Sequence, residues 1–256
     1  MFSCERDIVP VFSTPQGQLK TAWQWSLNRP VLGKNERIQK MRQLNFSNLS
    51  LPILQEILEL KQKGAADYDW TLTDRISLTD EESLILGHIT SGLRYYAAHL
   101  MNEATLWARA IYPLLQLAEK GDILASSEVP LNAAYPKFEL HGLADGVLGK
   151  CVAGNIGSPY LVIVEAKRGV EGKNPQPQIY GEILASARLN QKENGGEIQE
   201  IFGCYTIADV WTFVRGMVSE MESDRPCLIA EHSREYSEKS EADAILKILK
   251  SIVAKF

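Results

Sequence analysis

Residues 160–169 read Tyr-Leu-Val-Ile-Val-Glu-Ala-Lys-Arg-Gly, a stretch that predicts a buried strand ending in two opposite charges. The apolar, largely β-branched run follows a Gly-Ser-Pro turn and stops at Gly169, which is typical of a strand. Side chains alternate along a strand, so Glu165 and Lys167 share one face. Such charges are costly to bury unless they pair or hold a metal. Taken alone, the two residues favour a plain salt bridge at a strand end.

The composition excludes several classes of protein. The chain has 256 residues and a formal net charge of -5 at pH 7. That length allows one sizeable core with or without a helical subdomain, and the acidic balance argues against a protein that coats nucleic acid, though not against a local basic groove. The longest apolar runs are far too short for a membrane span, and the first residues contain early acids. Four scattered cysteines are typical of reduced thiols. We therefore expect a cytoplasmic protein with no membrane partner.

The first third of the sequence predicts helices and no chemical motif. Residues 1–80 are expected to form a mostly helical region packed on a core domain of residues 81–256. Within the first region, apolar residues recur at helical spacing from Leu51 to Lys63, and Gly64 ends that predicted helix.

A second helix is predicted to start at a capping box, with Thr79 as N-cap and Glu82 three residues later. Its helical periodicity continues to about Lys120, and Pro113 is expected to kink it. Glu103 falls within the apolar seam of this helix. A carboxylate there either meets a partner across the interface or lies at the seam's edge and reaches water, and the sequence leaves both open.

After Gly121 the hydrophobic period changes to two, which predicts strands. The loop at residues 154–159 should join Phe138–Leu148 to the strand of Glu165 as an antiparallel hairpin. Further along, the pattern predicts a helix from Gln176. The remaining predicted elements are a strand at Ser126–Leu131, a hairpin of Glu200–Tyr205 with Val210–Val214, and a helix from Ser240 to Lys255. The second half therefore has the order helix, strand, strand, strand, helix, strand.

This order brings acids together. Asp145 and Glu165 lie on neighbouring strands of one hairpin, so their carboxylates can converge on one cation. Mg²⁺ prefers carboxylate and carbonyl oxygens, which Asp145, Glu165 and the backbone carbonyl of Ala166 can supply. A bound metal lowers the pKa of its water, and Lys167 beside it could orient or deprotonate that water, or neutralise a phosphate.

Asp145 followed about twenty residues later by Glu165-Ala166-Lys167 resembles the motif of the PD-(D/E)xK nuclease superfamily, which has a restriction-endonuclease-like fold. The Val-Glu-Ala-Lys-Arg form is similar to that of type I restriction subunit nuclease domains, and Gln176-Pro-Gln-Ile-Tyr180 resembles the Gln-x-x-x-Tyr motif of RecB-like nucleases. The resemblance covers residues 85–215. Ala144 stands where the name-giving proline would be, a common variation.

The resemblance implies an α/β fold with a restriction-endonuclease-like core, a central mixed sheet flanked by helices, behind the helical N-terminal region. It makes Asp145 and Glu165 metal ligands and Lys167 the catalytic lysine. Glu103 would be the acid of the first helix. Either Gln176 or Gln178 would be the motif glutamine, and the sequence does not decide between them.

Other residues near the motif are candidates for substrate contacts. Arg168 and Lys173 flank the predicted site and could contact DNA phosphates, and Tyr180 completes the glutamine-tyrosine motif. Glu182 is expected to be a solvated helix charge.

The resulting hypothesis is a Mg²⁺-dependent deoxyribonuclease, an endonuclease of restriction, defence or repair type, with Mn²⁺ as a second candidate ion. Its expected partners are DNA and either a second copy of the chain or a partner protein that supplies specificity. The alternative is a catalytically silent nuclease fold that binds nucleic acid or regulates another protein. An unrelated enzyme in which Glu165 and Lys167 are a plain ion pair is the third reading.

Overall fold

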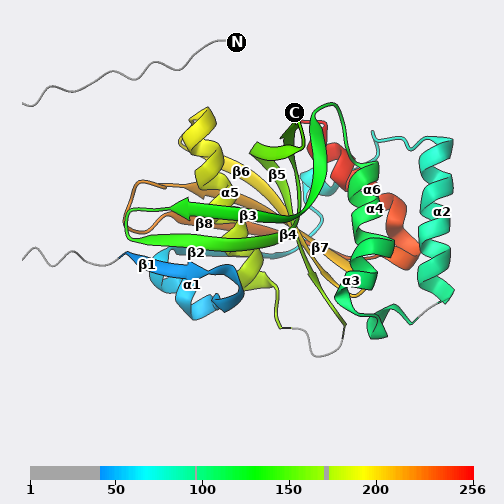
Figure 1. The fold of residues 1–256 in the computed structure, drawn as a ribbon, viewed down its shortest axis with the longest axis horizontal. Helices are drawn as coiled ribbons and strands as arrows, with labels where there is room; N and C mark the ends of the chain where they lie inside the picture. The colour runs from blue at the N-terminus through cyan, green and yellow to red at the C-terminus, as the bar shows by residue number, and fades with distance from the viewer. Residues whose placement is uncertain (1–40, 96, 170–172) are drawn as a thin grey trace, which may run out of the picture. The chain divides into compact units, whose positions relative to one another are not determined.

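The computed structural model describes residues 41–95, 97–169 and 173–256, which fall within a compact unit spanning Lys40–Phe256. An eight-stranded mixed sheet crosses this unit in the order β1-β4-β5-β6-β7-β8-β2, and β3 pairs with β4 off this path (Figure 1). The strands are β1 Arg42–Asn45, β2 Glu59–Ala65, β3 Ile123–Ala134, β4 Phe138–Val152, β5 Asn155–Lys167, β6 Gln199–Ile207, β7 Val210–Ser219 and β8 Cys227–Ser237. The α-helices are α1 Leu51–Ile57, α2 Asp80–Tyr95, α3 Glu103–Leu106, α4 Tyr112–Leu117, α5 Gln176–Asn194 and α6 Glu238–Val253.

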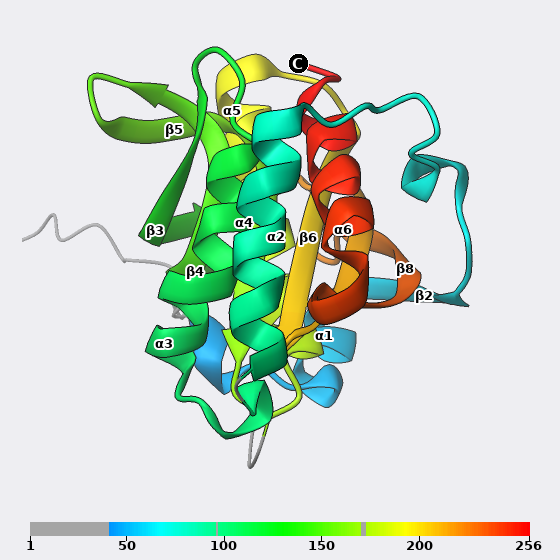
Figure 2. The same cartoon turned by 90° about the vertical axis from the view of Figure 1, so that its right-hand side faces the viewer.

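Helices cover both faces of the sheet, which gives an α/β architecture. One apolar cluster joins α2, α4 and α6 to the sheet (Figure 2), and a second joins α1 and α5 to the opposite face. Strand β5 contributes to both clusters, because Val162 and Val164 belong to the first and Ile163 to the second. The predicted buried strand is therefore confirmed. Within the described ranges, no helix is long and apolar enough to cross a membrane.

The predicted order helix, strand, strand, strand, helix, strand is confirmed by α4, β3, β4, β5, α5 and β6. The first three of these strands form an antiparallel meander, and β6 runs parallel to β5. Parallel neighbours need a crossover, which α5 provides. The predicted antiparallel hairpin is present, but the prediction that residues 154–159 form its loop is wrong. Strand β5 already begins at Asn155, because the turn needs only Ala153 and Gly154, both with positive φ.

The N-terminal prediction has a mixed outcome. Residues 1–40 lie outside the described residues, and residues 41–80 contain β1 and β2 of the main sheet with one α-helix between them. The helix predicted from Leu51 to Lys63 ends at Ile57, and Glu59–Ala65 instead pairs in parallel with β8. Pairing with a strand distant in the sequence overrides the local helical periodicity there. Because β2 extends the same sheet, residues 41–80 share one compact unit with the core.

The capping box is confirmed, since Glu82 N–H donates to Thr79 Oγ1 at 3.1 Å and Thr79 N–H donates to the Glu82 carboxylate at 2.8 Å. The single helix predicted to Lys120 is wrong, because α2 ends at Tyr95. A new helix starts at Glu103, where Asn102 accepts a hydrogen bond from Thr105 N–H. A π-helical turn at Trp107–Ile111 follows, and Pro113 lies two residues after its end, in the first turn of α4. Proline lacks the N–H for a helical hydrogen bond, which explains the irregular turn at this point.

Glu238, the first residue of α6, makes the stability depend on pH. Its side chain is fully buried and accepts a hydrogen bond from Trp211 Nε1 at 2.8 Å. Burial raises the pKa of Glu238 to about 8, and Asp209 adds to the rise. The folded state therefore holds a proton that the unfolded state releases near its ordinary pKa. The free energy of unfolding should fall as pH rises from about 5 to 8, with a slope of up to about 1.4 kcal/mol per pH unit from this group.

Substituting Glu238→Gln keeps an acceptor for Trp211 and removes the titration. Denaturant unfolding between pH 5 and 9 should show a shallower slope for this variant than for the wild type. Identical slopes would show that Glu238 does not carry a raised pKa. The variant should still lose some stability as pH rises, because the pKa values of the buried carboxyls Glu165 and Glu182 are also raised.

Candidate active site

Asp145 and Glu165 meet where β4 and β5 separate. The last paired residues of this ladder are Gly146 and Val164, so the next position places Asp145 opposite Glu165. Beyond the ladder, Ala166 N–H donates to Asp145 Oδ2 at 2.8 Å. The aspartate side chain thus takes the place of a strand hydrogen bond, which fixes its carboxylate beside the end of β5.

Glu165 is fully buried and is held from two sides. Gln178 Nε2 donates to Glu165 Oε2 at 2.7 Å. The other oxygen, Oε1, forms an ion pair with Lys167 Nζ. The Lys167 side chain remains 20% exposed. The salt bridge expected from the strand pattern is therefore present, and it lies in contact with further polar groups.

The prediction that Glu182 is a solvated helix charge is wrong. Its side chain is fully buried, Oε1 accepts a hydrogen bond from Gln178 Nε2 at 3.1 Å, and Oε2 has no hydrogen-bond partner. Helix α5 is buried on nearly every side, because it packs on β5 and β6 and is also covered by α1 and by the short helix at Phe46–Asn48. Gln178 thus donates to two buried carboxylates, those of Glu165 and Glu182.

The site holds more acidic groups than basic ones, and burial disfavours their charged forms. Burial and, after it, the nearby Asp145 charge raise the pKa of Glu165 to about 7. Burial also raises the pKa of Asp145 and that of Glu182. Burial alone would lower the pKa of Lys167, but contact with Glu165 outweighs it and leaves that pKa raised. The Lys167 ammonium is influenced by Glu165, Asp145 and Glu103, so acids outnumber bases here, an arrangement that a divalent cation would relieve.

Glu103 lies at the mouth of this cluster. A pocket of about 370 Å³ is bordered by Glu103, Asp145 and Ala166. The remaining lining residues are Ala104, Trp107, Ser127 and Glu128. Burial raises the pKa of Glu103, with the charges of Lys167 and Asp145 acting next. The sequence left open whether Glu103 meets a partner or reaches water. The structure shows a half-buried Glu103 at the start of α3, where it lines the same pocket as Asp145.

Glu128 is a site residue that sequence reasoning missed. It lies in β3 with φ 51° at the position beside Asp145, between the paired residues Ser127 and Val129. Its charge contributes to the raised pKa of Asp145. A glutamate within an alternating strand gives no sequence signal for this conformation.

The donor atoms suit a hard divalent cation. Across the described ranges, no three His, Cys, Asp or Glu side chains already stand as a complete metal-ligand set. However, Asp145 keeps Oδ1 outside its hydrogen bond with Ala166, and Glu165 Oε1 is paired with the Lys167 ammonium rather than with a neutral donor. Oxygen donors with excess negative charge match the preference of Mg²⁺ for carboxylates and carbonyls.

The remaining predicted site residues do not all lie in the acidic cluster. Gln178 contacts Glu165, whereas Gln176 Nε2 lies 3.5 Å from His232 Nε2. Tyr180 is fully buried, and its hydroxyl lies 2.6 Å from the same nitrogen of His232. Arg168 and Lys173 are exposed beyond the end of β5. Geometry thus selects Gln178 as the glutamine of the acidic cluster and places Gln176 and Tyr180 in a neighbouring polar group.

Removal of Gln178 tests this arrangement through stability. A Gln178→Ala protein leaves Glu165 and Glu182 without their common donor, which should lower the free energy of unfolding by about 1–3 kcal/mol. Denaturant unfolding at neutral pH measures the change. Gln116→Ala, at an exposed position of α4, is the control and should change it by less than about 0.5 kcal/mol. Equal stability of both variants would contradict a structural role of the Gln178 contacts.

Comparison with known proteins adds no identity, since no family model matches the chain and no curated protein matches it significantly.

Proposed function

We propose that this protein is a metal-dependent nuclease that hydrolyses DNA phosphodiester bonds in the cytoplasm. The observation that supports the proposal is the convergence of Asp145, Glu165, Lys167 and Gln178 at the end of β5. These residues lie on a core in which an antiparallel meander of three strands is followed by a helix and a parallel strand. That order agrees with the restriction-endonuclease-like core implied by the sequence resemblance.

Each residue has a role in this proposal. Asp145, Glu165 and the carbonyl of Ala166 would hold Mg²⁺ or Mn²⁺, with Glu103 completing the set. The bound ion supplies charge stabilisation at the phosphate and a more acidic water. Lys167, with its ammonium next to Glu165, orients the attacking water or neutralises a phosphate oxygen. The water oxygen bonds to phosphorus and gives up a proton, the bond between phosphorus and one sugar oxygen breaks, and that sugar oxygen takes up a proton, so no proton is gained or lost overall.

Gln178 is a positioning residue in this scheme. Its amide holds Glu165 Oε2 at 2.7 Å and so fixes which oxygen of Glu165 faces Lys167. Arg168 directly follows Lys167, and Lys173 precedes α5. Both are exposed and are the proposed contacts for the DNA backbone, which basic side chains bind through phosphates.

A cleavage assay tests the proposed function. Supercoiled plasmid and linear duplex DNA are incubated with the protein in Mg²⁺, Mn²⁺ or EDTA. We expect cutting with either metal and none in EDTA, and nicked or linear plasmid would identify an endonuclease. The absence of cutting under both metals would contradict independent nuclease activity and favour the silent, nucleic-acid-binding alternative.

A further inference from the structure

A second polar pocket lies beside the acidic cluster, on the other side of the start of α5. It has a volume of about 700 Å³, within the range of small-molecule sites. Buried His232, Ser233 and Thr212 form part of its wall, and Gln62 and Gln176 lie at its edge. The other lining residues are Lys63, Gly64, Ala65, Tyr205, Arg234 and Glu235.

A chain of hydrogen bonds orients the amides of this pocket. Gln62 Nε2 donates to the Tyr180 hydroxyl at 2.9 Å, and that hydroxyl lies 2.6 Å from His232 Nε2. Burial lowers the pKa of His232, which keeps the imidazole neutral so that Nε2 can accept. Gln176 Nε2 lies 3.5 Å from the same nitrogen. Both amide NH₂ groups thus face the protein, and the oxygens of Gln62 and Gln176 remain as acceptors.

The strand that carries His232 is irregular on both sides. Its pairing with β7 shifts between Thr212 and Val214, and its pairing with β2 shifts at Gly64. Ser233 Oγ stabilises the first bulge by accepting a hydrogen bond from Phe213 N–H at 2.9 Å. Bulges re-aim side chains and are common beside active sites. The two bulges lie on either side of the strand at His232, so regular pairing is interrupted where this pocket forms.

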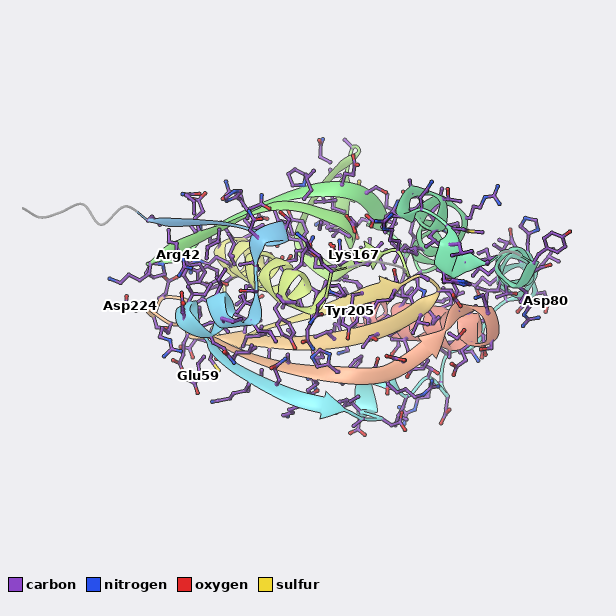
Figure 3. The ribbon with its side chains drawn as sticks, turned by 90° about the horizontal axis from the view of Figure 1, so that it is seen from below. Arg42, Glu59, Asp80, Lys167, Tyr205 and Asp224 are labelled. Carbon is purple, nitrogen blue, oxygen red and sulfur yellow. The ribbon has the colours of Figure 1, made fainter. Side chains whose placement is uncertain are left out.

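The pocket and the acidic cluster lie along one row of the sheet. Glu165 of β5 is paired with Tyr205 of β6, and Tyr205 with Thr212 of β7. Lys167 lies on β5 two residues beyond Glu165, and Figure 3 labels Lys167 and Tyr205 in one view. Glu165 and Thr212 are therefore two strand spacings apart, about 10 Å. A nucleotide with its phosphate at Lys167 can extend its base over Tyr205 into the pocket.

We propose that the pocket between Gln62, Gln176, Tyr205 and His232 binds a nucleobase of the substrate strand, next to the phosphate held at Lys167. This inference rests on the proposed nuclease function. The Tyr205 ring offers a face for stacking, and the acceptor oxygens of two amides select bases with an exocyclic amino group, as glutamine does with adenine. Such a base must be unpaired or turned out of the duplex to enter.

Mononucleotide binding in EDTA tests the pocket without any cleavage. Calorimetric titration of the full chain with deoxyadenosine monophosphate should show binding, and thymidine monophosphate should bind about fivefold or more weakly. 2-Deoxyribose 5-phosphate lacks the base and should bind at least about fivefold more weakly than the adenine nucleotide. Gln62→Ala and Tyr205→Leu should each weaken the binding of deoxyadenosine monophosphate at least about fivefold, and the control Gln116→Ala should leave that affinity unchanged.

Equal affinity for the adenine nucleotide and 2-deoxyribose 5-phosphate would overturn the inference, as would wild-type affinity in both pocket variants. The plasmid assay separates this failure from failure of the proposed function. Cutting of the plasmid without base-dependent nucleotide binding would support the nuclease proposal and contradict the proposed base pocket. Base-dependent nucleotide binding without plasmid cutting would support the proposed base pocket and contradict the nuclease proposal.

Discussion

A Lys167→Ala protein is expected to cut DNA at least about 100-fold more slowly than the wild type, because a positioned proton-transfer or charge-stabilising group contributes at least this much. The structure gives the reason, since the Lys167 ammonium contacts Glu165 and keeps a 20% exposed side chain through which it can reach a substrate. The single-turnover rate of plasmid cutting in saturating Mg²⁺ measures the effect.

Lys150→Ala is the matched control for this substitution. Lys150 is an exposed lysine in β4 that pairs with Asp122 at 3.7 Å. Its removal takes away the same charge without touching the acidic cluster, so the cutting rate should stay within about twofold of wild type, as expected for a surface pair. A Lys167→Ala protein as active as the Lys150→Ala protein would show that Lys167 has no catalytic role.

The second large effect is expected from Gly146→Val, a substitution that overfills the core beside Asp145. A Cβ atom at Gly146 would lie 2.3 Å from the Trp107 ring and 3.4 Å from Leu115. Trp107 also donates from Nε1 to Ser127 Oγ at 3.1 Å, so its displacement breaks that bond and moves a wall of the pocket near Glu103. We expect the free energy of unfolding to fall by about 1–3 kcal/mol. Cleavage should fall as well, because Asp145 is the adjacent residue.

Valine is a favourable strand residue, so propensity alone predicts no loss from this substitution. Gly157→Ala in β5 is the control, since a Cβ there meets nothing within 4 Å. Denaturant unfolding of the two variants should show a loss for Gly146→Val alone. Wild-type stability of Gly146→Val would contradict the close packing of Trp107 on β4.

The elements that local patterns specify were predicted well. The apolar run ending at Glu165 predicted a buried strand, and α6 and the hairpin of β6 and β7 followed from their periodicity. Asp145, Glu165 and Lys167 were brought together by two strands joined in one hairpin, a short-range arrangement. Local sequence is sufficient in these cases because the partners are near neighbours along the chain.

Features that depend on distant partners were not predictable. Strand β2 looked helical because its pairing with β8 lies far away in the sequence. Glu182 looked solvated because the cover on α5 comes in part from α1. Gln176 and Gln178 occupy the same helical turn, and only the position of Glu165 separates their roles. Likewise His232 shows no motif, and its link to Tyr180 appears only in the folded chain.

The most direct test of the central claim compares cutting of supercoiled plasmid in Mg²⁺ by the wild type and by Asp145→Asn. Asparagine keeps an oxygen for Ala166 N–H and removes the negative charge, so the fold should persist. The account predicts Mg²⁺-dependent cutting by the wild type and a loss of at least about 100-fold in the variant. Equal cutting by both proteins would contradict the assignment of Asp145 and Glu165 as the metal-binding pair.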